Sequence, residues 1–375
     1  MNPQAQYGAD VIMRANYALE HGTEALSMCV RKAVNEMLGS LAEDAGIRRE
    51  DVFQVCVVGN TCMHHLFLGI SPASLVHAPY TPAVSERLVL NAGDYGLAVQ
   101  ERAELIMLSD IAGYVGADTC GCLLAIRQDQ QEEISLMIDI GTNGEMVLGN
   151  RERMVTCSTA AGPAFEGAKI ECGMRGAAGA VDHVKYEDGK WNYTTVGNKP
   201  AFGLCGSGLI DLVAGLLDAG MLDENGVLRS GQEKQSVFIL VPPERGGNER
   251  GVYLTQKDLG EVQLAKAAIA AGIQMLMERL GITEDDICSV YIAGAFGNYM
   301  DPVSAGKIGL LPATLVKKVK PVGNAAGEGA KIALVNEKEM LEMDELVRKI
   351  EFVELAASAD FQDHFIDELG FETGE

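Results

Sequence analysis

The sequence predicts an α/β protein built from two lobes. Its 375 residues exceed the roughly 250 to 300 at which a single hydrophobic core stops growing. Short apolar runs typical of buried strands alternate with segments of helical periodicity. The 43 glycines are spread over many turns, and apolar residues make up 47% of the chain, as in a globular protein. The polar run Gln128–Glu133 marks the predicted boundary between a first lobe, 1–133, and a second lobe, 134–375.

In the first lobe, apolar residues at helical spacing predict two helices between Ala9 and Ala45. The β-branched run Val52–Val58 predicts a strand that leads through a polar turn into a helix. The segment Asp110–Ile126 is rich in Gly and Ala, which predicts a helix whose neighbours approach too closely for larger side chains.

In the second lobe, apolar runs predict a meander of three strands at Ser135–Ile140, Glu145–Leu148 and Arg153–Cys157. The segment Gly226–Gly251 lacks periodicity and contains paired prolines and glycines, so it is predicted to be a surface connection. Leu264–Leu280 predicts a long Ala-rich helix, and the strand Ser289–Ile292 is predicted to follow it.

Charge and hydropathy exclude several classes of partner. The formal net charge of −23 would repel a phosphate backbone, which argues against nucleic acid. No stretch reaches the roughly 18 uncharged apolar residues of a membrane span, and the amino terminus lacks the features of a secretory signal. The nine cysteines form no C-x-x-C pair and lie mostly in apolar runs, as free thiols do in reducing compartments. We therefore expect a cytoplasmic protein that binds neither nucleic acid nor membrane.

The segment Asp139–Glu145, D-I-G-T-N-G-E, lies between two predicted strands and is suited to binding phosphate. Its glycines let the backbone approach an oxyanion, its Thr and Asn offer donors, and its Asp carboxylate suits a hydrated Mg²⁺. The candidate residues are Asp139, as the magnesium ligand, with Gly141, Thr142, Asn143 and Gly144. Asn-Gly is also the strongest short-range signal for a plain hairpin, and that alternative stays open.

Three further Gly-rich turns follow a predicted strand or precede a predicted helix, whose first N–H groups attract anions. They are Phe202–Asp211, Ala293–Asn298 and Val322–Ala330. Small residues also serve tight packing between strands and helices, so each turn alone is a weak signal of ligand contact. Together with the Asp139 turn, and in this order, they are a specific pattern.

In this pattern the chain resembles the reductive activators of corrinoid-dependent methyltransferase systems. The resemblance runs from Asn2 to the closing pair Phe361 and Phe365, and it is carried by Asn2–Asp10, Val57–Gly69, the Asp139 turn, Ala160–Ala168, the Cys205 turn, Leu254–Asp258, Gln263–Ile269, the Gly294 turn and Gly309–Pro312. It implies a two-lobed actin-like ATPase fold with ribonuclease H-like lobes, which sugar kinases and heat-shock chaperones share.

The resemblance also implies roles for particular residues. Asp139 to Glu145 would form the second phosphate loop, with Asp139 and Glu166 as the catalytic carboxylates. The role of Glu166 is implied by the resemblance only, and a structural carboxylate is the alternative. The remaining nucleotide contacts would be Gly206, Ser207 and Gly208 at a helix start, and Gly294, Ala295, Phe296, Gly297 and Asn298 in an adenosine turn.

Two departures from the family pattern lead to further expectations. Members normally carry an iron–sulfur domain, a linker and a middle domain upstream, and the cysteine pattern of that region is missing here, so we expect the cluster on an upstream domain only. Met1 stands where the family has a first phosphate hairpin, an acidic residue followed by Gly-Thr-Thr. We therefore expect the first lobe to be incomplete at its amino terminus, ATP binding to be weakened, and hydrolysis to be slow or absent. The alternative is that an upstream segment was trimmed or is supplied separately.

The function implied by the resemblance is ATP-dependent return of a Co(II) corrinoid protein to Co(I). A gap of ~300 mV would cost roughly 7 kcal/mol, more than a few tuned contacts supply. ATP and Mg²⁺ would close the cleft between lobes and change the grip on the corrinoid partner. A homodimer is expected from the family. Two alternatives remain, a small-molecule phosphotransferase of the same fold and a non-catalytic protein-binding module.

Overall fold

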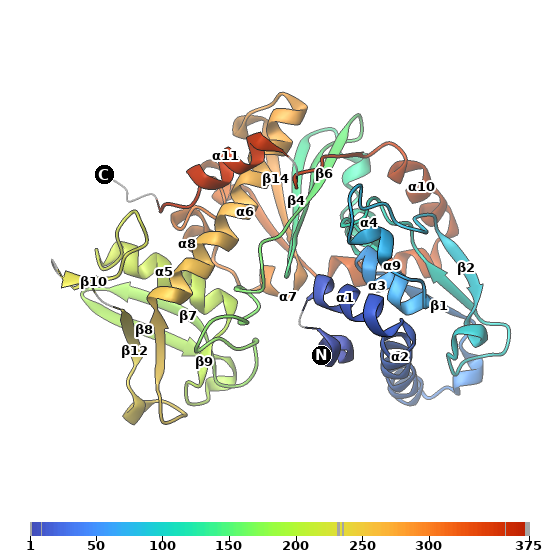
Figure 1. The fold of residues 1–375 in the computed structure, drawn as a ribbon, viewed down its shortest axis with the longest axis horizontal. Coiled ribbons are helices and arrows are strands. Elements are labelled where there is room, and N and C mark those ends of the chain that lie inside the picture. Colours follow the sequence, from blue (N-terminus) through green and yellow to red (C-terminus); the bar gives the residue numbers. More distant parts are fainter. Residues whose placement is uncertain (1, 9, 231–232, 235, 357, 372–375) are drawn as a thin grey trace. The chain divides into compact units, whose positions relative to one another are not determined.

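The computed structural model describes residues 2–8, 10–230, 233–234, 236–356 and 358–371. The chain forms two compact units (Figure 1). Unit 1 comprises Met1–Gln130 and Asn324–Phe352, and unit 2 comprises Gln131–Gly323 and Val353–Glu375. The sequence predicts two continuous lobes, whereas the structure groups the late segment Asn324–Phe352 with the amino-terminal part of the chain.

Unit 1 is built around a sheet with the strand order β1-β3-β2. β1 (Gln54–Val57) is parallel to β3 (Glu104–Met107), and β2 (Leu88–Asn91) is antiparallel to β3. The helices of the amino-terminal segment are α1 (Val11–His21), α2 (Glu24–Ala45) and α3 (Thr61–Leu68). Single 3-10 turns connect these elements at Pro3–Tyr7, Arg49–Asp51, Ala73–Leu75, Ala92–Tyr95 and Gln128–Gln130.

Polar N-caps and glycine C-caps set the ends of these helices. The side chains of Asp10 and Asn60 accept N–H groups in the first turns of α1 and α3. Gly46 and Gly69 end α2 and α3 in the left-handed conformation, which a residue without Cβ adopts at no steric cost.

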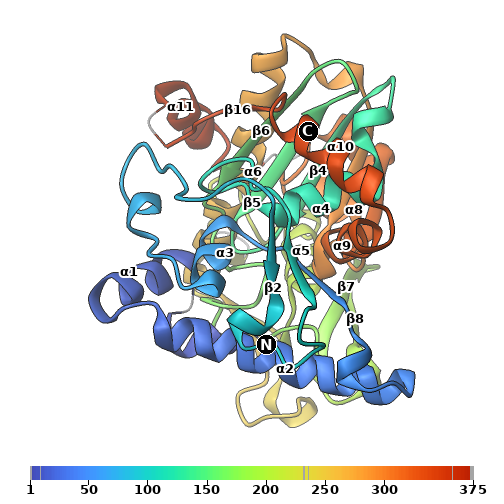
Figure 2. The ribbon, with the colours of Figure 1, turned by 90° about the vertical axis from the view of Figure 1, so that its right-hand side faces the viewer.

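Close packing of two helices brings the late segment into unit 1. α4 (Ala117–Ile126) lies against α9 (Ala325–Val335), as Figures 1 and 2 both show. A Cβ atom at Gly121 would lie 2.6 Å from the carbonyl oxygen of Ala326, a distance that real Cβ contacts do not reach. The predicted tightly packed helix is thus confirmed. It begins at Ala117 rather than Asp110, whose carboxylate accepts the N–H of Ala117 at 2.9 Å.

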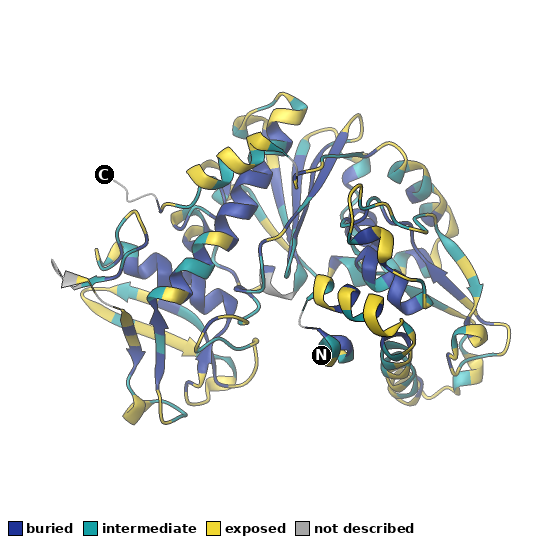
Figure 3. Cartoon of the chain, in the orientation of Figure 1, coloured by how far each residue is buried: buried dark blue, intermediate teal, exposed yellow. Residues whose placement is uncertain are grey.

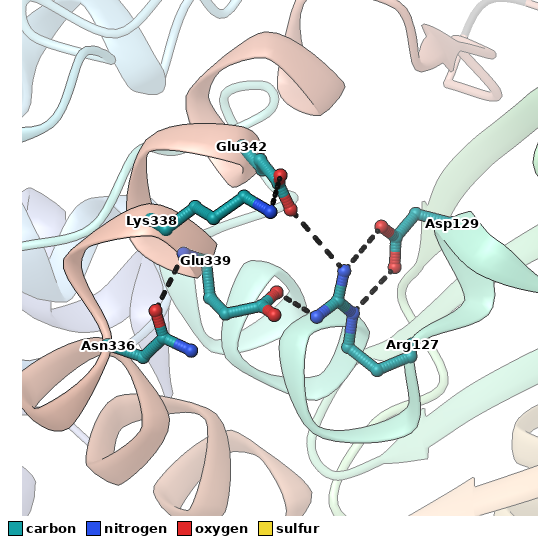
Figure 4. A network of polar contacts seen from close by, with 6 residues as sticks. All are labelled: Arg127, Asp129, Asn336, Lys338, Glu339 and Glu342. Atoms are coloured by element: carbon teal, nitrogen blue, oxygen red, sulfur yellow. Dashed lines mark hydrogen bonds and ion pairs between the residues drawn. The ribbon is translucent and has the colours of Figure 1, made fainter.

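Arg127 connects the end of α4 to α10 (Glu337–Val347) in the same unit (Figure 4). Its guanidinium forms two hydrogen bonds with Asp129, at 3.1 and 3.2 Å, and pairs with Glu339. A longer ion pair of 3.7 Å joins it to Glu342. Arg127 also ends α4 in the left-handed conformation. The two-residue strand β16 (Glu351–Phe352) follows α10.

The central sheet of unit 2 has the strand order β15-β14-β4-β5-β6. The predicted meander is confirmed, since β4, β5 and β6 are antiparallel neighbours. β14 is parallel to both β4 and β15, so the carboxyl ends of these three strands lie at one edge. The bounds are β4 Ile134–Ile140, β5 Gly144–Gly149, β6 Met154–Thr159, β14 Ile287–Ala293 and β15 Val319–Gly323.

A second group of strands in unit 2 precedes and follows helix α5 (Gly206–Asp218). β7 (Ala180–Glu187) lies between β8 (Lys190–Thr195) and β9 (Gly203–Leu204). β12 (Val237–Val241) pairs with β13 (Val252–Thr255), and the side chain of Val241 is fully buried. The predicted surface connection at Gly226–Gly251 is therefore wrong in part, because a strand with one buried face lies within it. The short strands β10 (Arg229–Ser230) and β11 (Glu233–Lys234) also pair there.

The long helix α6 (Gln256–Leu280) packs on β5 and β6 and provides much of the core of unit 2. Figure 3 shows β4 and the inner face of α6 as buried. The helix begins eight residues before the predicted start, because Thr255 and Asp258 form a reciprocal capping box. The remaining elements of unit 2 are α7 (Gly294–Gly297), α8 (Pro302–Lys307), α11 (Ala359–Asp367) and 3-10 turns at Val196–Asn198, Pro243–Arg245, Glu284–Asp286 and Ala313–Lys318.

Within the described residues, every helix is too short or too polar to cross a membrane.

Candidate functional site

Two of the predicted turns meet at the carboxyl ends of β4 and β14. The parallel register places Asp139 beside Ala293, so the turn that starts at Gly294 begins next to the Asp139 side chain. Gly294 has φ +86°, and a Cβ atom there would lie 2.9 Å from Oδ1 of Asp139. Both the backbone conformation and the short approach therefore require a glycine at this position.

Glu166 joins this edge through the turn between β4 and β5. Oγ1 of Thr142 donates a hydrogen bond to Oε1 of Glu166 at 2.9 Å. The turn itself is closed by the N–H of Gly141, which donates to the carbonyl oxygen of Asn143 at 2.9 Å. The sequence left open whether this segment is a hairpin or a phosphate turn. The structure shows a hairpin whose Asp139 and Gly141 also line a cavity.

The first turn of α5 supplies free donor groups to the same place. Its N-cap residue, Cys205, has extended backbone geometry, and its side chain does not cap the backbone N–H groups of the first turn. The N–H groups at the start of a helix lack intrahelical partners and carry partial positive charge. Ser207 is buried, with its hydroxyl 3.4 Å from the sulfur of Cys205. This helix start is therefore suited to an anionic group.

These elements surround a cavity of about 700 Å³ that lies entirely within unit 2. Its volume is in the range of small-molecule sites, and it combines apolar walls with a few polar groups. The lining residues are Asp139, Ile140, Gly141, Phe165, Glu166, Met174, Arg175, Gly176, Asp182, Val196, Gly197, Cys205, Gly206, Ser207, Gly294 and Tyr299.

Packing between β7 and α5 holds two walls of this cavity together. The buried carboxylate of Asp211 on α5 accepts the N–H of Val184 at 3.2 Å and lies 3.1 Å from Nδ1 of His183. Burial raises the pKa of Asp211 above its ordinary value, and hydrogen bonds from Ser304, Val184 and His183 oppose the shift. The β7 register shifts between Val181 and His183, a bulge that re-aims the intervening Asp182.

Six of the predicted site residues line the cavity, and the others that the structure describes have different contacts. The six are Asp139, Gly141, Glu166, Gly206, Ser207 and Gly294. Thr142 reaches the site through Glu166, and Asn143 closes the turn. Three predicted glycines serve packing instead, because a Cβ atom would clash with a neighbour. The clash would be with Thr159 at Gly144, with Val181 at Gly208 and with Ile292 at Gly297. Asn298 lines a separate cavity. The side chains of Ala295 and Phe296 lie outside the described residues.

Several lining residues escaped the sequence analysis. Arg175 and Asp182 bring charge to the cavity, and Phe165 and Tyr299 bring aromatic surface. No local motif surrounds Arg175. Its position depends on a loop that pairs with β9. Pairing between distant segments cannot be predicted from the amino acids next to Arg175.

Comparison with known proteins decides the family. Residues 133–375 match the family described as the C-terminal domain of RACo, the ASKHA domain. The chain belongs to this family. The actin-like ATPase fold that the resemblance implied is thereby confirmed for the RACo C-terminal domain of this chain, as is the resemblance to reductive activators of corrinoid proteins.

Relatives of the RACo family cover nearly the whole chain. It is 35% identical, over 384 residues, to the corrinoid activation enzyme RamQ of Eubacterium limosum, covering 98% of this chain and 64% of RamQ. A [Co(II) methylated amine-specific corrinoid protein] reductase of Methanosarcina barkeri is 26% identical over 399 residues, which are 98% of this chain and 71% of the reductase. A solved structure of a reductive activator for corrinoid, iron-sulfur protein superposes with a TM-score of 0.89 at 38% identity, covering 99% of this chain and 61% of that one.

Residues 1–131 match a second family, described as the RACo middle region. The expectation that the middle domain lies upstream of this chain is therefore wrong, because the chain itself contains the matching segment. The chain spans 64% of RamQ and 61% of the solved activator.

Proposed function

We propose that this chain binds Mg-ATP in the unit 2 cavity and serves as the ATP-dependent part of a reductive activator that returns a Co(II) corrinoid protein to Co(I). The observation that carries the proposal is the meeting of Asp139 and Gly294 beside the uncapped start of α5. The family match and the printed names of the relatives support the choice of reaction.

The residues around the cavity fit a nucleotide with magnesium. The helix start and the glycine turns offer N–H donors and room for close backbone approach, which polyphosphate requires. The described residues contain no cluster of three or more His, Cys, Asp or Glu side chains that could hold a metal. Mg²⁺ suits such a site, since it is usually bound by one or two carboxylates, phosphate oxygens and water. Asp139 would hold it, and magnesium would neutralise charge on the phosphates.

In this proposal, residues of the cavity position the nucleotide and the attacking water. Asp139 would orient the hydrated cation, and Glu166, fixed by Thr142 at 2.9 Å, would accept a hydrogen bond from water. Binding energy gained at the β4–β5 turn and the Gly294 turn would favour one arrangement of the activator over another. The electron would come from an iron–sulfur centre, which we place on an upstream domain of the whole activator.

A cytoplasmic location and a homodimer belong to the same proposal. The free cysteines, of which Cys62, Cys120, Cys122, Cys157 and Cys205 are buried, suit a reducing compartment. Sedimentation of the purified chain tests the homodimer directly, since a monomer at micromolar concentration contradicts it.

Thermal unfolding of the chain with and without Mg-ATP tests the nucleotide site. Ligand at 100 times its dissociation constant stabilises the bound state by about 2.7 kcal/mol, which raises the melting temperature by several degrees. Asp139→Asn should lose most of this increase, because the magnesium ligand is weakened. Asp188→Asn is the matched control, since Asp188 is exposed in the turn between β7 and β8, has φ +51° and lines no part of the cavity. Equal increases in the wild type and Asp139→Asn contradict the assignment.

Co(I) formation by the full-length activator tests the reaction. Absorbance spectra should show Co(I) corrinoid with Mg-ATP and much less without it. Equal rates in the two reactions rule out coupling between ATP and electron transfer.

A further inference from the structure

The charges around the unit 2 cavity are unbalanced. Asp139, Glu166 and Asp182 contribute three carboxylates, while Arg175 is the one cationic side chain among the described residues that line it. The Arg175 side chain is exposed and makes no hydrogen bond or ion pair with any residue in the described part of the chain. A guanidinium carries five N–H donors, and here they are available to a ligand.

The backbone holds Arg175 next to the start of α5. The N–H of Met174 donates to the carbonyl oxygen of Leu204 at 2.8 Å, and the N–H of Leu204 donates to the carbonyl oxygen of Cys172 at 2.7 Å. Gly173 and Leu204 form a parallel bridge. Met174 is the last residue of this loop that pairs with β9, and Arg175 comes directly after it. In the same way, Cys205, the N-cap of α5, comes directly after Leu204, the last residue of β9.

This loop is fixed by steric fit as well as by hydrogen bonds. A Cβ atom at Gly203 would press on the carbonyl oxygen of Cys172, and one at Gly167 would lie 2.5 Å from the carbonyl oxygen of Met174. Glycines at both positions let three segments of backbone pack directly against one another. Arg175 is thus an exposed side chain on an anchored main chain, which lowers the entropy that a ligand must remove.

Arg175 and the helix start supply two kinds of positive potential to one place. The first-turn N–H groups of α5 provide fixed partial charges, and the guanidinium provides a full charge with a planar fork that matches phosphate oxygens. A nucleoside polyphosphate brings several negative charges into a cavity that already holds three carboxylates. One magnesium ion leaves part of that charge uncompensated.

We propose that Arg175 binds the polyphosphate of the nucleotide in this cavity. The inference rests on the proposed function and identifies the side chain that selects for phosphorylated ligands there. The guanidinium donates to phosphate oxygens and contributes little to binding of the nucleoside portion. Discrimination between ATP or ADP and adenosine is then a property of residue 175 together with the start of α5.

Binding of Mg-ATP, Mg-ADP and adenosine to the whole chain by calorimetry tests this role. Arg175→Ala should raise the dissociation constants of ATP and ADP about tenfold to a hundredfold, as loss of charge-assisted hydrogen bonds does. The dissociation constant of adenosine should change about twofold or less. Arg175→Lys should lose less than Arg175→Ala, because it keeps the charge without the fork.

Arg250→Ala is the matched control. Arg250 is an exposed arginine of the same unit that does not line the cavity, so its removal changes the net charge equally. ATP binding should be unchanged in this variant, and the urea midpoints of both alanine variants should equal that of the wild type.

The outcomes separate this inference from the proposed function. Failure of the wild-type chain to bind Mg-ATP overturns the nucleotide site and the role of Arg175 with it. Wild-type binding with an unchanged Arg175→Ala overturns the role of Arg175 alone. Equal losses of ATP and adenosine binding, or an equal loss in Arg250→Ala, also overturn it, because neither result is specific to phosphate.

Discussion

Gly294 has a backbone conformation and a close neighbour that both disfavour a side chain at this position. Its φ of +86° lies in the region that favours glycine, and its Cβ position is 2.9 Å from Oδ1 of Asp139. We expect Gly294→Ala to lower the free energy of unfolding by about 1–3 kcal/mol, through backbone strain and displacement of the carboxylate. Because Asp139 moves, Mg-ATP binding should weaken as well. Urea unfolding and calorimetry measure the two effects.

Gly281→Ala separates strain from displacement. Gly281 ends α6 with φ +69°, and its Cβ position has no atom within 4 Å. The alanine there should cost about 1 kcal/mol of stability and leave ATP binding unchanged. If both variants bind ATP as the wild type does, the contact between position 294 and Asp139 has no part in nucleotide binding.

At the scale of residues, the sequence identifies groups whose local pattern is strong and misses those placed by distant pairing. Asp139 was found because a buried strand runs directly into a Gly-rich turn. Gly294 was found for the same reason, and the parallel register of β4 and β14 brings the two together. Arg175 is placed by the bond between Met174 and Leu204, and nothing around residue 175 in the sequence indicates it. Gly208 looked like a phosphate contact but lies where a Cβ would press on Val181.

At the scale of elements, Arg127 is the principal polar connection described here between α4 and α10. Its side chain is about one quarter exposed and contacts Asp129, Glu339 and Glu342 (Figure 4). We expect Arg127→Ala to lower the free energy of unfolding by roughly 1–2 kcal/mol, because several partly buried carboxylates lose one partner. The loss should shrink in high salt, which screens the exposed part of the network.

Arg151→Ala is the control for this prediction. Arg151 forms an ion pair of 2.9 Å with Glu132, and both side chains are at least half exposed. Such a pair contributes about 0–1 kcal/mol, so urea unfolding should barely change. An equally small loss for Arg127→Ala would show that its network is no stronger than an ordinary surface pair.

Element boundaries follow from caps when the capping residues are correctly identified. The start of α6 was predicted eight residues late because its first two turns carry few apolar residues, while the capping box of Thr255 and Asp258 marks where the helix begins. β12 was missed because Pro242 and Pro243 at its end suggested a loop. Its pairing with β13 and the burial of Val241 depend on a segment more than ten residues away.

At the scale of the whole molecule, the chain passes from unit 2 to unit 1 at Gly323, which ends β15 beside the Gly294 turn. A Cβ atom at Gly323 would lie 3.1 Å from Nδ2 of Asn298. The Gly294 turn, which ends at Asn298, therefore contacts Gly323, the crossing point of the chain. The next residue, Asn324, caps α9 by accepting the N–H of Gly327 at 3.1 Å. The sequence did not predict that α9 belongs to unit 1, because this grouping depends on the packing of α9 against Gly121 of α4.

Amide hydrogen exchange tests whether this contact carries the effect of the nucleotide beyond the cavity. Mg-ATP should slow exchange at the β4–β5 turn and at the start of α5, where backbone N–H groups would meet phosphate. Slower exchange should also appear from Gly323 to Gly327, since ordering of the Gly294 turn restricts Asn298 and, through it, the crossing point. Asp139→Asn should lose all of these changes together. Protection confined to the cavity, with none at Gly323 to Gly327, would mean that nucleotide binding is not transmitted through this connection, and the proposed coupling between ATP and a corrinoid protein would have to follow another route.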